Sequence, residues 1–216
     1  MYLAHDLKTP LTSVIGYLSL MRDEPQISPE LRAKYTGIAL EKAERLEELI
    51  NEFFDITRFN LTHISLELEN VNLTRLAEQT VFEFEPILKE KGLSWKLDID
   101  NGIELLCDAD KMERVLDNII RNAVSYSYPD NEIMLTLKRT ERSVILSVKN
   151  RGKTISEEKL SRIFEQFYRL DSSRGTKSGG AGLGLAIAKE ITELHGGTIT
   201  AESSDESVTF TVELPL

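Results

Sequence analysis

The chain has 216 residues, 41% of them hydrophobic and 29% charged, a globular composition long enough for one sizeable domain or two modest ones. Its formal net charge of −10 argues against a general nucleic-acid binder, because counterion release at phosphates requires clustered Lys and Arg, so we expect no direct nucleic-acid contact. The single cysteine, Cys107, excludes an internal disulfide and a cysteine zinc cluster, and its apolar surroundings predict a buried strand position.

Two helices are predicted in the first part of the chain. Apolar residues recur at helical spacing over residues 3–21 and again over residues 30–61. Pro25, Ser28 and Pro29 separate the two patterns, with Ser28 expected as the N-cap of the second helix and Pro29 as its first residue. No run approaches the ~20 apolar residues of a membrane span, and no signal peptide opens the sequence.

The predicted hairpin of residues 1–61 cannot bury both of its apolar stripes by itself. Pairing with a second copy into a four-helix bundle would cover them, so we expect a homodimer. The alternative is that the hairpin packs as an arm against the rest of the chain. The periodicity of the stripes does not separate these two interpretations.

Mixed helix and strand patterns predict a second domain at residues 71–216, after a polar linker at residues 62–70. The expected architecture has helices packed on one face of a mixed sheet, which makes the fold class α+β. His195 precedes two glycines and is expected to end a helix at a glycine C-cap. Helices are predicted at residues 73–91, 110–126 and 183–194, and strands at residues 93–99, 103–107, 133–137, 143–149, 198–201 and 208–214.

The most informative stretch is HDLKTP, residues 5–10. His5 provides an imidazole nucleophile, Asp6 a carboxylate that can orient its Nδ1–H, and Thr9 a hydroxyl that can position water. Because residues i and i+4 share a helix face, His5 and Thr9 are expected to point the same way. The simpler interpretation is a helix start with a surface histidine, and it is the downstream motifs that favour the chemical one.

A second set of residues suits a magnesium–nucleotide complex. Asn118 and Asn122 are four residues apart on one predicted helix, so both amides can face the same cleft, and an amide oxygen is a hard ligand suited to Mg²⁺. A glycine-rich segment then leads into the last predicted helix, where close backbone amides and a helix N-terminus can bind phosphate. The alternatives are capping asparagines and a flexible loop. The segment contains Gly179, Gly180, Gly182, Leu183 and Gly184.

Four segments resemble, in the same order, the motifs of the sensor histidine kinases of two-component systems. The chain is also similar to the vancomycin-resistance sensor kinases of the VanS type. The resemblance spans nearly the whole chain and implies that residues 71–216 form the α/β sandwich of the GHKL ATPases. The four segments are the phosphoacceptor box at residues 5–10, the N-box at 117–123 (DNIIRNA), the F-box at 163–169 (IFEQFYR) and the second glycine box at 179–185 (GGAGLGL).

This resemblance implies ATP and Mg²⁺ as cofactors. Asn122 is the implied metal ligand, Arg169 the residue that contacts phosphate, and residues 170–178 a lid over the nucleotide. Phe164 and Phe167 are expected to anchor the base of that lid by packing. The residues expected to bind nucleotide are Asn118, Asn122, Tyr126, Asn150, Gly152, Arg169, Gly180, Gly182, Leu183 and Gly184.

Two positions depart from the family pattern. At residues 150–152 (NRG) the family has Asp-x-Gly, whose carboxylate accepts a hydrogen bond from the adenine amino group. Asn150 is a neutral acceptor that can also donate, so adenine recognition is expected to survive with altered strength. Ser125 stands where the family usually has Lys, which removes a cation near the phosphates. Tyr126 stays available to stack on or beside the base.

The expected function is that of a sensor histidine kinase core. His5 takes the γ-phosphoryl group of ATP with Asp6 as base and orienting group, an aspartate of a response regulator receives it, and Thr9 supports dephosphorylation of that partner. One alternative is a degenerate member that works as a phosphatase or ATP-regulated scaffold. Another is a GHKL ATPase of the chaperone or topoisomerase kind, which has no use for the box at residues 5–10.

The histidine lies only four positions after Met1. We therefore expect the chain to be a fragment of a longer protein, with a membrane-anchored sensor ahead of it as is usual in the family. The implied localisation is the cytoplasmic portion of a cell-membrane protein, which would contact the membrane only through that absent sensor region. The VanS likeness points to control of glycopeptide resistance.

Overall fold

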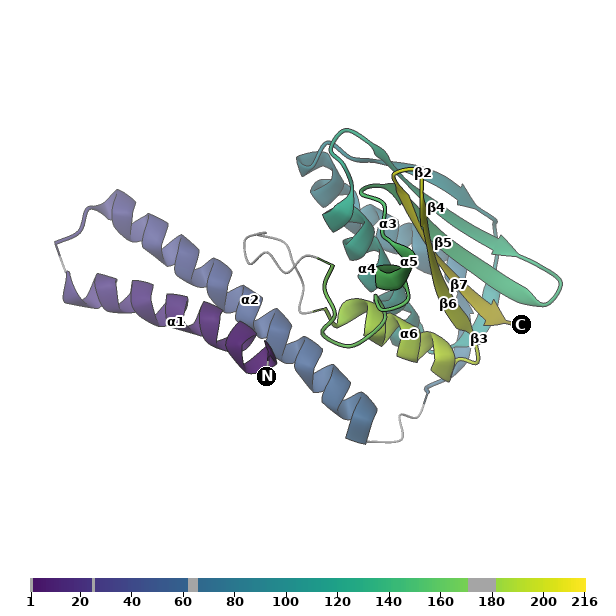
Figure 1. The fold of residues 1–216 in the computed structure, drawn as a ribbon, viewed down its shortest axis with the longest axis horizontal. Helices are drawn as coiled ribbons and strands as arrows, with labels where there is room; N and C mark the ends of the chain where they lie inside the picture. Colours follow the sequence, from purple (N-terminus) through teal and green to yellow (C-terminus); the bar gives the residue numbers. More distant parts are fainter. Residues whose placement is uncertain (1, 25, 62–65, 171–181) are drawn as a thin grey trace. The chain divides into compact units, whose positions relative to one another are not determined.

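The computed structural model describes residues 2–24, 26–61, 66–170 and 182–216, without the side chains of residues 2–6, 48 and 51–61. The chain forms two compact units, Met1–His63 and Ile64–Leu216 (Figure 1). The first is a helical hairpin and the second a sheet covered by helices, which confirms the predicted α+β class. Among the described residues, none of the helices combines the length and apolarity that a membrane span requires.

The hairpin consists of α1 (Tyr2–Asp23) and α2 (Pro29–Leu61). Ser28 caps α2 as predicted, because its Oγ accepts a hydrogen bond from the backbone N–H of Leu31 at 3.2 Å. Pro29 is the first helical residue, where its missing N–H costs no hydrogen bond. The tyrosine rings of Tyr17 and Tyr35 meet between the helices with their centroids 5.4 Å apart.

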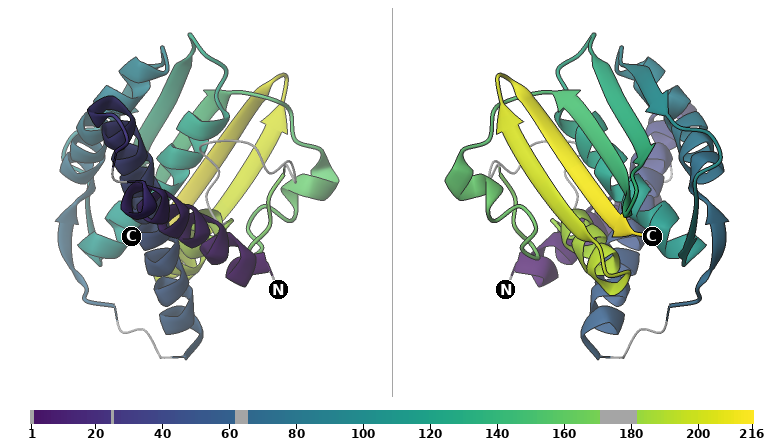
Figure 2. Two further views of the ribbon diagram at one scale, coloured as in Figure 1. Left: turned by 90° about the vertical axis from the view of Figure 1, so that its left-hand side faces the viewer. Right: turned by 90° about the vertical axis from the view of Figure 1, so that its right-hand side faces the viewer.

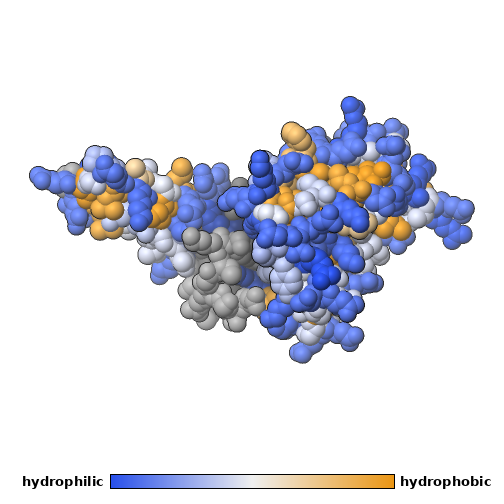
Figure 3. All heavy atoms as spheres, turned by 90° about the horizontal axis from the view of Figure 1, so that it is seen from above, coloured by the Kyte–Doolittle hydropathy of each residue, from blue (hydrophilic) through white to orange (hydrophobic). Residues whose placement is uncertain are grey.

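Apolar side chains remain exposed on this hairpin. Leu40 is 58% exposed and Ile15 is 55% exposed, whereas Ala39 and Leu49 are buried. Figure 3 shows such apolar surface between hydrophilic patches on the hairpin. Within the first unit, the two helices therefore cover only part of each other's apolar stripe. The large exposed apolar residues of the hairpin are Leu11, Ile15, Leu18, Leu20, Leu31, Leu40 and Ile50.

The second unit is built on a mixed sheet. In the part of the chain that the structure describes, five strands pair in the order β2-β4-β5-β7-β6. β2 is parallel to β4, and the other neighbours are antiparallel. The strands are β2 (Ser94–Ile99), β4 (Glu132–Arg139), β5 (Ser143–Arg151), β6 (Thr198–Ser204) and β7 (Ser207–Pro215).

Three helices lie on one face of this sheet, α3 (Leu73–Glu90), α4 (Ala109–Tyr126) and α6 (Gly184–Leu194) (Figures 1 and 2). A short helix, α5 (Glu157–Leu160), follows β5. Alternate residues of the central strands point to the helices and form the core, because successive strand side chains face opposite sides. They include Ile133, Leu135, Leu137, Val144, Leu146, Val148, Phe210 and Val212.

One strand pair was not predicted. β1 (Glu69–Asn72) begins inside the expected linker of residues 62–70 and pairs antiparallel with β3 (Glu104–Cys107), separately from the main sheet. The mostly polar sequence of β1 does not alternate regularly between apolar and polar residues, so its strand structure is evident only from its pairing with β3. Cys107 lies fully buried in β3, as predicted.

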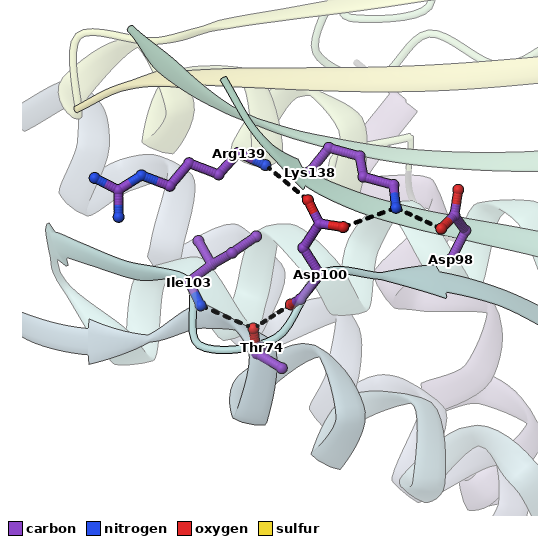
Figure 4. A network of polar contacts seen from close by, with 6 residues as sticks. All are labelled: Thr74, Asp98, Asp100, Ile103, Lys138 and Arg139. Carbon is purple, nitrogen blue, oxygen red and sulfur yellow. Dashed lines mark hydrogen bonds and ion pairs between the residues drawn. The ribbon is translucent and has the colours of Figure 1, made fainter. Parts of the chain in front are cut away.

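Polar contacts join β2, β4 and the start of α3. Lys138 Nζ lies 2.5 Å from Asp98 Oδ1 and 2.8 Å from Asp100 Oδ1 (Figure 4). The Thr74 hydroxyl donates to the carbonyl of Asp100 at 2.7 Å and accepts from the N–H of Ile103 at 3.1 Å. These contacts hold the β2–β3 connection against the first turn of α3.

Candidate functional site

The helix α4 is positioned by its cap and by its apolar stripe. The Oδ1 of Asp108 accepts the backbone N–H of Lys111 at 3.1 Å and begins the helix. The buried stripe runs through Met112, Val115, Leu116, Ile119, Ile120 and Ala123. This packing leaves Asn118 and Asn122 on a half-buried face of the helix.

The N-box and the glycine box meet at α6. A β-carbon on Gly184, the first residue of α6, would lie 2.6 Å from Oδ1 of Asn118. Only glycine leaves room for that amide at the helix N-terminus, where backbone N–H groups without helical partners carry partial positive charge. The structure thus brings an amide oxygen of the N-box to the helix end that the sequence predicted for phosphate.

The F-box and the glycine box are also joined. The backbone N–H of Phe167 donates to the carbonyl of Gly182 at 2.9 Å. Gly182 has φ +76°, and a β-carbon on it would lie 2.7 Å from the carbonyl oxygen of Tyr168. The guanidinium of Arg162 lies 4.5 Å from the ring centroid of Tyr168 and pairs with Glu165, which stabilises this turn.

Phe167 corrects one prediction. It is 39% exposed with φ +64°, so it holds the segment through its backbone and not by packing. Phe164 does pack, edge-on against Phe210 with ring centroids 6.5 Å apart. Arg169 lies exposed beyond this turn. The exposed backbone turn at Phe167 had no signal in the hydrophobic pattern.

Asn150 lies at the end of β5 on the helix-covered face of the sheet, in line with the buried Val148. It is 2% exposed, and within the described part of the chain its Nδ2 has no hydrogen-bond partner. A β-carbon on Gly152 would lie 2.4 Å from the carbonyl oxygen of Tyr126 and 3.1 Å from Nδ2 of Asn150. The end of α4 therefore closes against the segment that carries this buried amide.

The segment after Asn150 is held by a turn that sequence reasoning missed. The backbone N–H of Gly152 donates to the carbonyl of Glu206 at 2.9 Å, and the N–H of Glu206 donates to Oγ1 of Thr154 at 3.0 Å. Glu206 sits in the β6–β7 turn with φ +54°. No local sequence signal links this turn to Asn150, since β7 meets β5 only in the folded sheet.

A cavity of about 180 Å³ borders the end of α4. Ser125 lines it, and so does Lys91, whose Nζ donates to the carbonyl of Val124 at 3.2 Å. A cation from the end of α3 thus lies beside the position at which the family pattern has lysine. Lys91 was not among the predicted site residues.

The far ends of α4 and α6 are tied together by His195, which ends α6 before Gly196 at φ +73°, as predicted. Its Nε2 accepts the backbone N–H of Asp108 at 3.0 Å, while Nδ1 lies 2.8 Å from the carbonyl of Ile191. Nδ1–H donates to that carbonyl and Nε2 carries no proton, which is the arrangement of one tautomer of the neutral imidazole.

The structure thus brings the predicted residues of the second unit together in two places, Asn118 with Gly184, and Tyr126 and Asn150 with Gly152. Tyr126 is 41% exposed at the end of α4, and Leu183 is fully buried ahead of α6. Gly180 lies outside the described residues, as does the rest of the segment 171–181. In the first unit, α1 includes His5 and Asp6, whose side chains lie outside the description, and Thr9 is exposed on the same helix.

Comparison with known proteins matches both units to families. Residues 107–216 match the histidine kinase-, DNA gyrase B- and HSP90-like ATPases, and residues 1–61 match the phospho-acceptor domain of histidine kinases. The chain belongs to the sensor histidine kinases. The Bacillus subtilis sensor histidine kinase YcbM is 33% identical over 98% of this chain and 69% of its own length.

Within the sensor histidine kinases the chain is similar to proteins of the VanS type. It is 56% identical to the sensor protein VanSC of Enterococcus gallinarum over 99% of the chain, and 48% identical to the sensor protein VanS of Enterococcus faecium over 100%. These matches span 59% and 56% of the two relatives, so the chain corresponds to less than two thirds of their length.

Solved histidine kinases share the fold. The Acinetobacter baumannii kinase AdeS superposes with a TM-score of 0.80 over 98% of this chain and 97% of its own, at 24% identity. The histidine kinase ThkA, solved in complex with the response regulator protein TrrA, has a TM-score of 0.77 over 99% of this chain and 60% of its own, at 26% identity.

Proposed function

We propose that this chain is a kinase core that phosphorylates its own His5 from ATP and passes the phosphoryl group to an aspartate of a response regulator. One observation carries the proposal: a phospho-acceptor hairpin and an ATPase unit occur in the same chain, each matching its family. The motif contacts within the ATPase unit, Asn118 with Gly184 and Phe167 with Gly182, support it further.

In the first step Nε2 of His5 attacks the γ-phosphorus in line. The bond from that phosphorus to the β–γ bridging oxygen breaks, ADP leaves, and phosphohistidine forms. Asp6 orients the imidazole through Nδ1–H and stabilises its positive charge as the P–N bond forms. Arg169, exposed beyond the F-box turn, is the residue we assign to charge that develops on the transferred group.

The residues present suit a purine nucleotide with its metal ion. The buried amide of Asn150 has an Nδ2 that pairs with none of the described residues and can be offered to a base, and the exposed Tyr126 has its carbonyl oxygen against Gly152. The N-terminus of α6 at Gly184 suits phosphate. When bound, Mg²⁺ neutralises phosphate charge, and we assign Asn122 as its protein ligand because an amide oxygen adds no charge to the triphosphate.

In the second step a carboxylate oxygen of a regulator aspartate attacks the phosphorus, the P–N bond breaks, and His5 leaves as neutral imidazole that keeps its Nδ1–H while the acyl phosphate forms. The structurally similar histidine kinase ThkA was solved in complex with the response regulator protein TrrA, which supports a partner of this kind. We assign Thr9 to the opposing phosphatase activity, in which its hydroxyl positions a water molecule that dephosphorylates the response regulator. Thr9 is exposed on α1, one turn after His5.

The exposed apolar residues of the hairpin support a homodimer, in which a second copy would cover Ile15 and Leu40. We further propose that the chain is the cytoplasmic part of a membrane sensor that controls glycopeptide resistance. Its identity to VanSC and VanS supports that role.

The deciding experiment incubates the chain with Mg²⁺ and γ-labelled ATP beside a His5→Gln variant. Acid-labile, alkali-stable label that disappears in the variant is expected. Label that survives in His5→Gln would remove His5 as the nucleophile. The matched control is Arg22→Gln, which changes an exposed residue of the same helix outside the phosphoacceptor box and should keep the label.

The second candidate is a degenerate member that acts as a phosphatase or ATP-regulated scaffold. It is favoured by Asn150 and Ser125, which replace the Asp and Lys of the family pattern in the nucleotide site. In that case ATP would bind without labelling His5, while dephosphorylation of the regulator would persist. Transfer of phosphate from ATP to His5 excludes this candidate.

A further inference from the structure

The amide of Asn150 differs from a carboxylate in what it can pair with. It lies 2% exposed on the helix-covered face of the sheet, and in the described ranges its Nδ2 finds no acceptor. A buried N–H group left unpaired destabilises the fold, so this donor favours a ligand that brings an acceptor. A carboxylate at the same place would have no donor to satisfy.

The two purines present opposite groups at position 6. Adenine has an amino donor there and an acceptor at N1, whereas guanine has the O6 acceptor and a donor at N1. An amide pairs with adenine through Oδ1 and Nδ2, and a half-turn about Cβ–Cγ exchanges these atoms so that it pairs equally with guanine. A carboxylate accepts from the adenine amino group but would face O6 of guanine with a second acceptor.

The surroundings of Asn150 allow both orientations of the amide. Its neighbour Gly152 leaves Nδ2 free of a side chain, since a β-carbon there would lie 3.1 Å from that atom. The strand neighbours of Asn150 are Ile133 on β4 and Val208 on β7, both buried and apolar, so neither side chain selects one end of the amide. The end of α4 contributes the carbonyl of Tyr126 beside Gly152.

We propose that Asn150 makes the base site accept both 6-amino and 6-oxo purine nucleoside triphosphates, so that GTP binds and donates phosphate beside ATP. This inference rests on the proposed function, because it assigns the specificity of the same nucleotide site. The reaction is unchanged: the γ-phosphoryl group moves to His5 and GDP leaves in place of ADP.

The test measures the affinities of ATP, GTP and ITP with Mg²⁺ by calorimetry on the His5→Gln chain, in which the nucleotide is not consumed. GTP and ITP are expected to bind within about tenfold of ATP, since each purine makes the same number of hydrogen bonds with the amide. ITP isolates position 6, because it has the 6-oxo group of GTP without the 2-amino group.

The decisive variant is Asn150→Asp, read as the ratio of GTP to ATP affinity. That ratio is expected to fall on the order of 10- to 100-fold, because the carboxylate then places an acceptor opposite the O6 acceptor of guanine. Asn101→Asp makes the same chemical change at an exposed turn and should leave the ratio unchanged. An unchanged ratio in Asn150→Asp overturns the inference.

The failures are distinguishable. ATP binding without GTP or ITP binding overturns the inference and leaves the proposed function standing. Binding of none of the three overturns the proposed function, and this inference with it. If thermal unfolding shows that Asn150→Asp does not fold, ITP on the unaltered base site decides: affinity within tenfold of ATP supports the inference, and weaker binding overturns it.

Discussion

The amide oxygen of Asn118 occupies the space next to Gly184 that a side chain would need, with 2.6 Å between that oxygen and the position of a β-carbon. The contact couples the middle of α4 to the first turn of α6. Two motifs that are far apart in the chain thus share one point of contact. Their spacing depends on a residue without a side chain at position 184.

We expect Gly184→Ala to weaken ATP binding by about tenfold, because the new methyl group displaces the amide of Asn118 from the helix N-terminus. Calorimetric titration measures the change. Gly37→Ala is the matched control, since a β-carbon at that helical position meets nothing within 4 Å and should leave affinity unaltered.

The same mechanism predicts non-additivity. If Gly184→Ala acts by moving Asn118, it should cost less affinity in an Asn118→Ala background than in the natural chain. Costs that add fully in the double variant would mean that the methyl group acts through the backbone of α6 instead.

Asp108 is expected to stabilise the second unit in a pH-dependent way. Burial raises the pKa of this carboxyl, but hydrogen bonds from Lys111 Nζ and from the backbone N–H groups of Glu67 and Lys111 outweigh it, so the pKa lies below its usual value. The carboxylate therefore contributes stability that is fully present above the unfolded pKa of about 3.9 and is lost as pH falls through the lower folded value.

Asp108→Asn should lower the free energy of unfolding in urea by about 1–3 kcal/mol at pH 7 and by the same amount at pH 5. The difference from the natural chain should shrink only below about pH 4. Asp98→Asn, which removes an exposed ion pair with Lys138, should leave the free energy of unfolding nearly unchanged because solvent screens that pair. A difference that already shrinks between pH 7 and pH 5 would contradict this account.

Cys107 is expected to resist thiol reagents in the folded chain. Burial, and then the negative charges of Asp108 and Glu69, raise its pKa to about 11, and the side chain is fully buried in β3. At pH 8 only about one thiol in a thousand would be ionised. Ellman's reagent should react slowly without denaturant and rapidly in urea, at the rate at which the unit unfolds. Prompt stoichiometric reaction with the folded chain would show that β3 opens on its own.

Thr9→Ala should separate two activities of the hairpin. We expect autophosphorylation of His5 to persist while dephosphorylation of the response regulator falls at least about tenfold, because the hydroxyl positions water and does not take part in phosphoryl transfer. Thr12→Ala, an exposed threonine of the same helix, is the control for both assays. Loss of both activities in Thr9→Ala would show that Thr9 does not act in dephosphorylation alone.

Local sequence patterns located most elements closely. The helix predicted at residues 110–126 is found at Ala109–Tyr126, because a strong apolar stripe and a capping Asp mark its start. β1 escaped prediction because its three polar residues and Val71 show no regular alternation, and its strand character comes from pairing with β3. Phe167 was expected to anchor the base of the lid by packing, whereas its left-handed backbone places it at an exposed turn.

The sequence by itself determined the elements, the fold class and the family, since periodicity, capping residues and motif order are properties of neighbours along the chain. Only the tertiary structure decided which motif residues touch. The contact of Asn118 with Gly184 depends on how α4 packs against α6. Asn150 is buried because the strand register places it in line with Val148. Its strand neighbours Ile133 and Val208 are apolar, and among the described residues its Nδ2 has no hydrogen-bond partner.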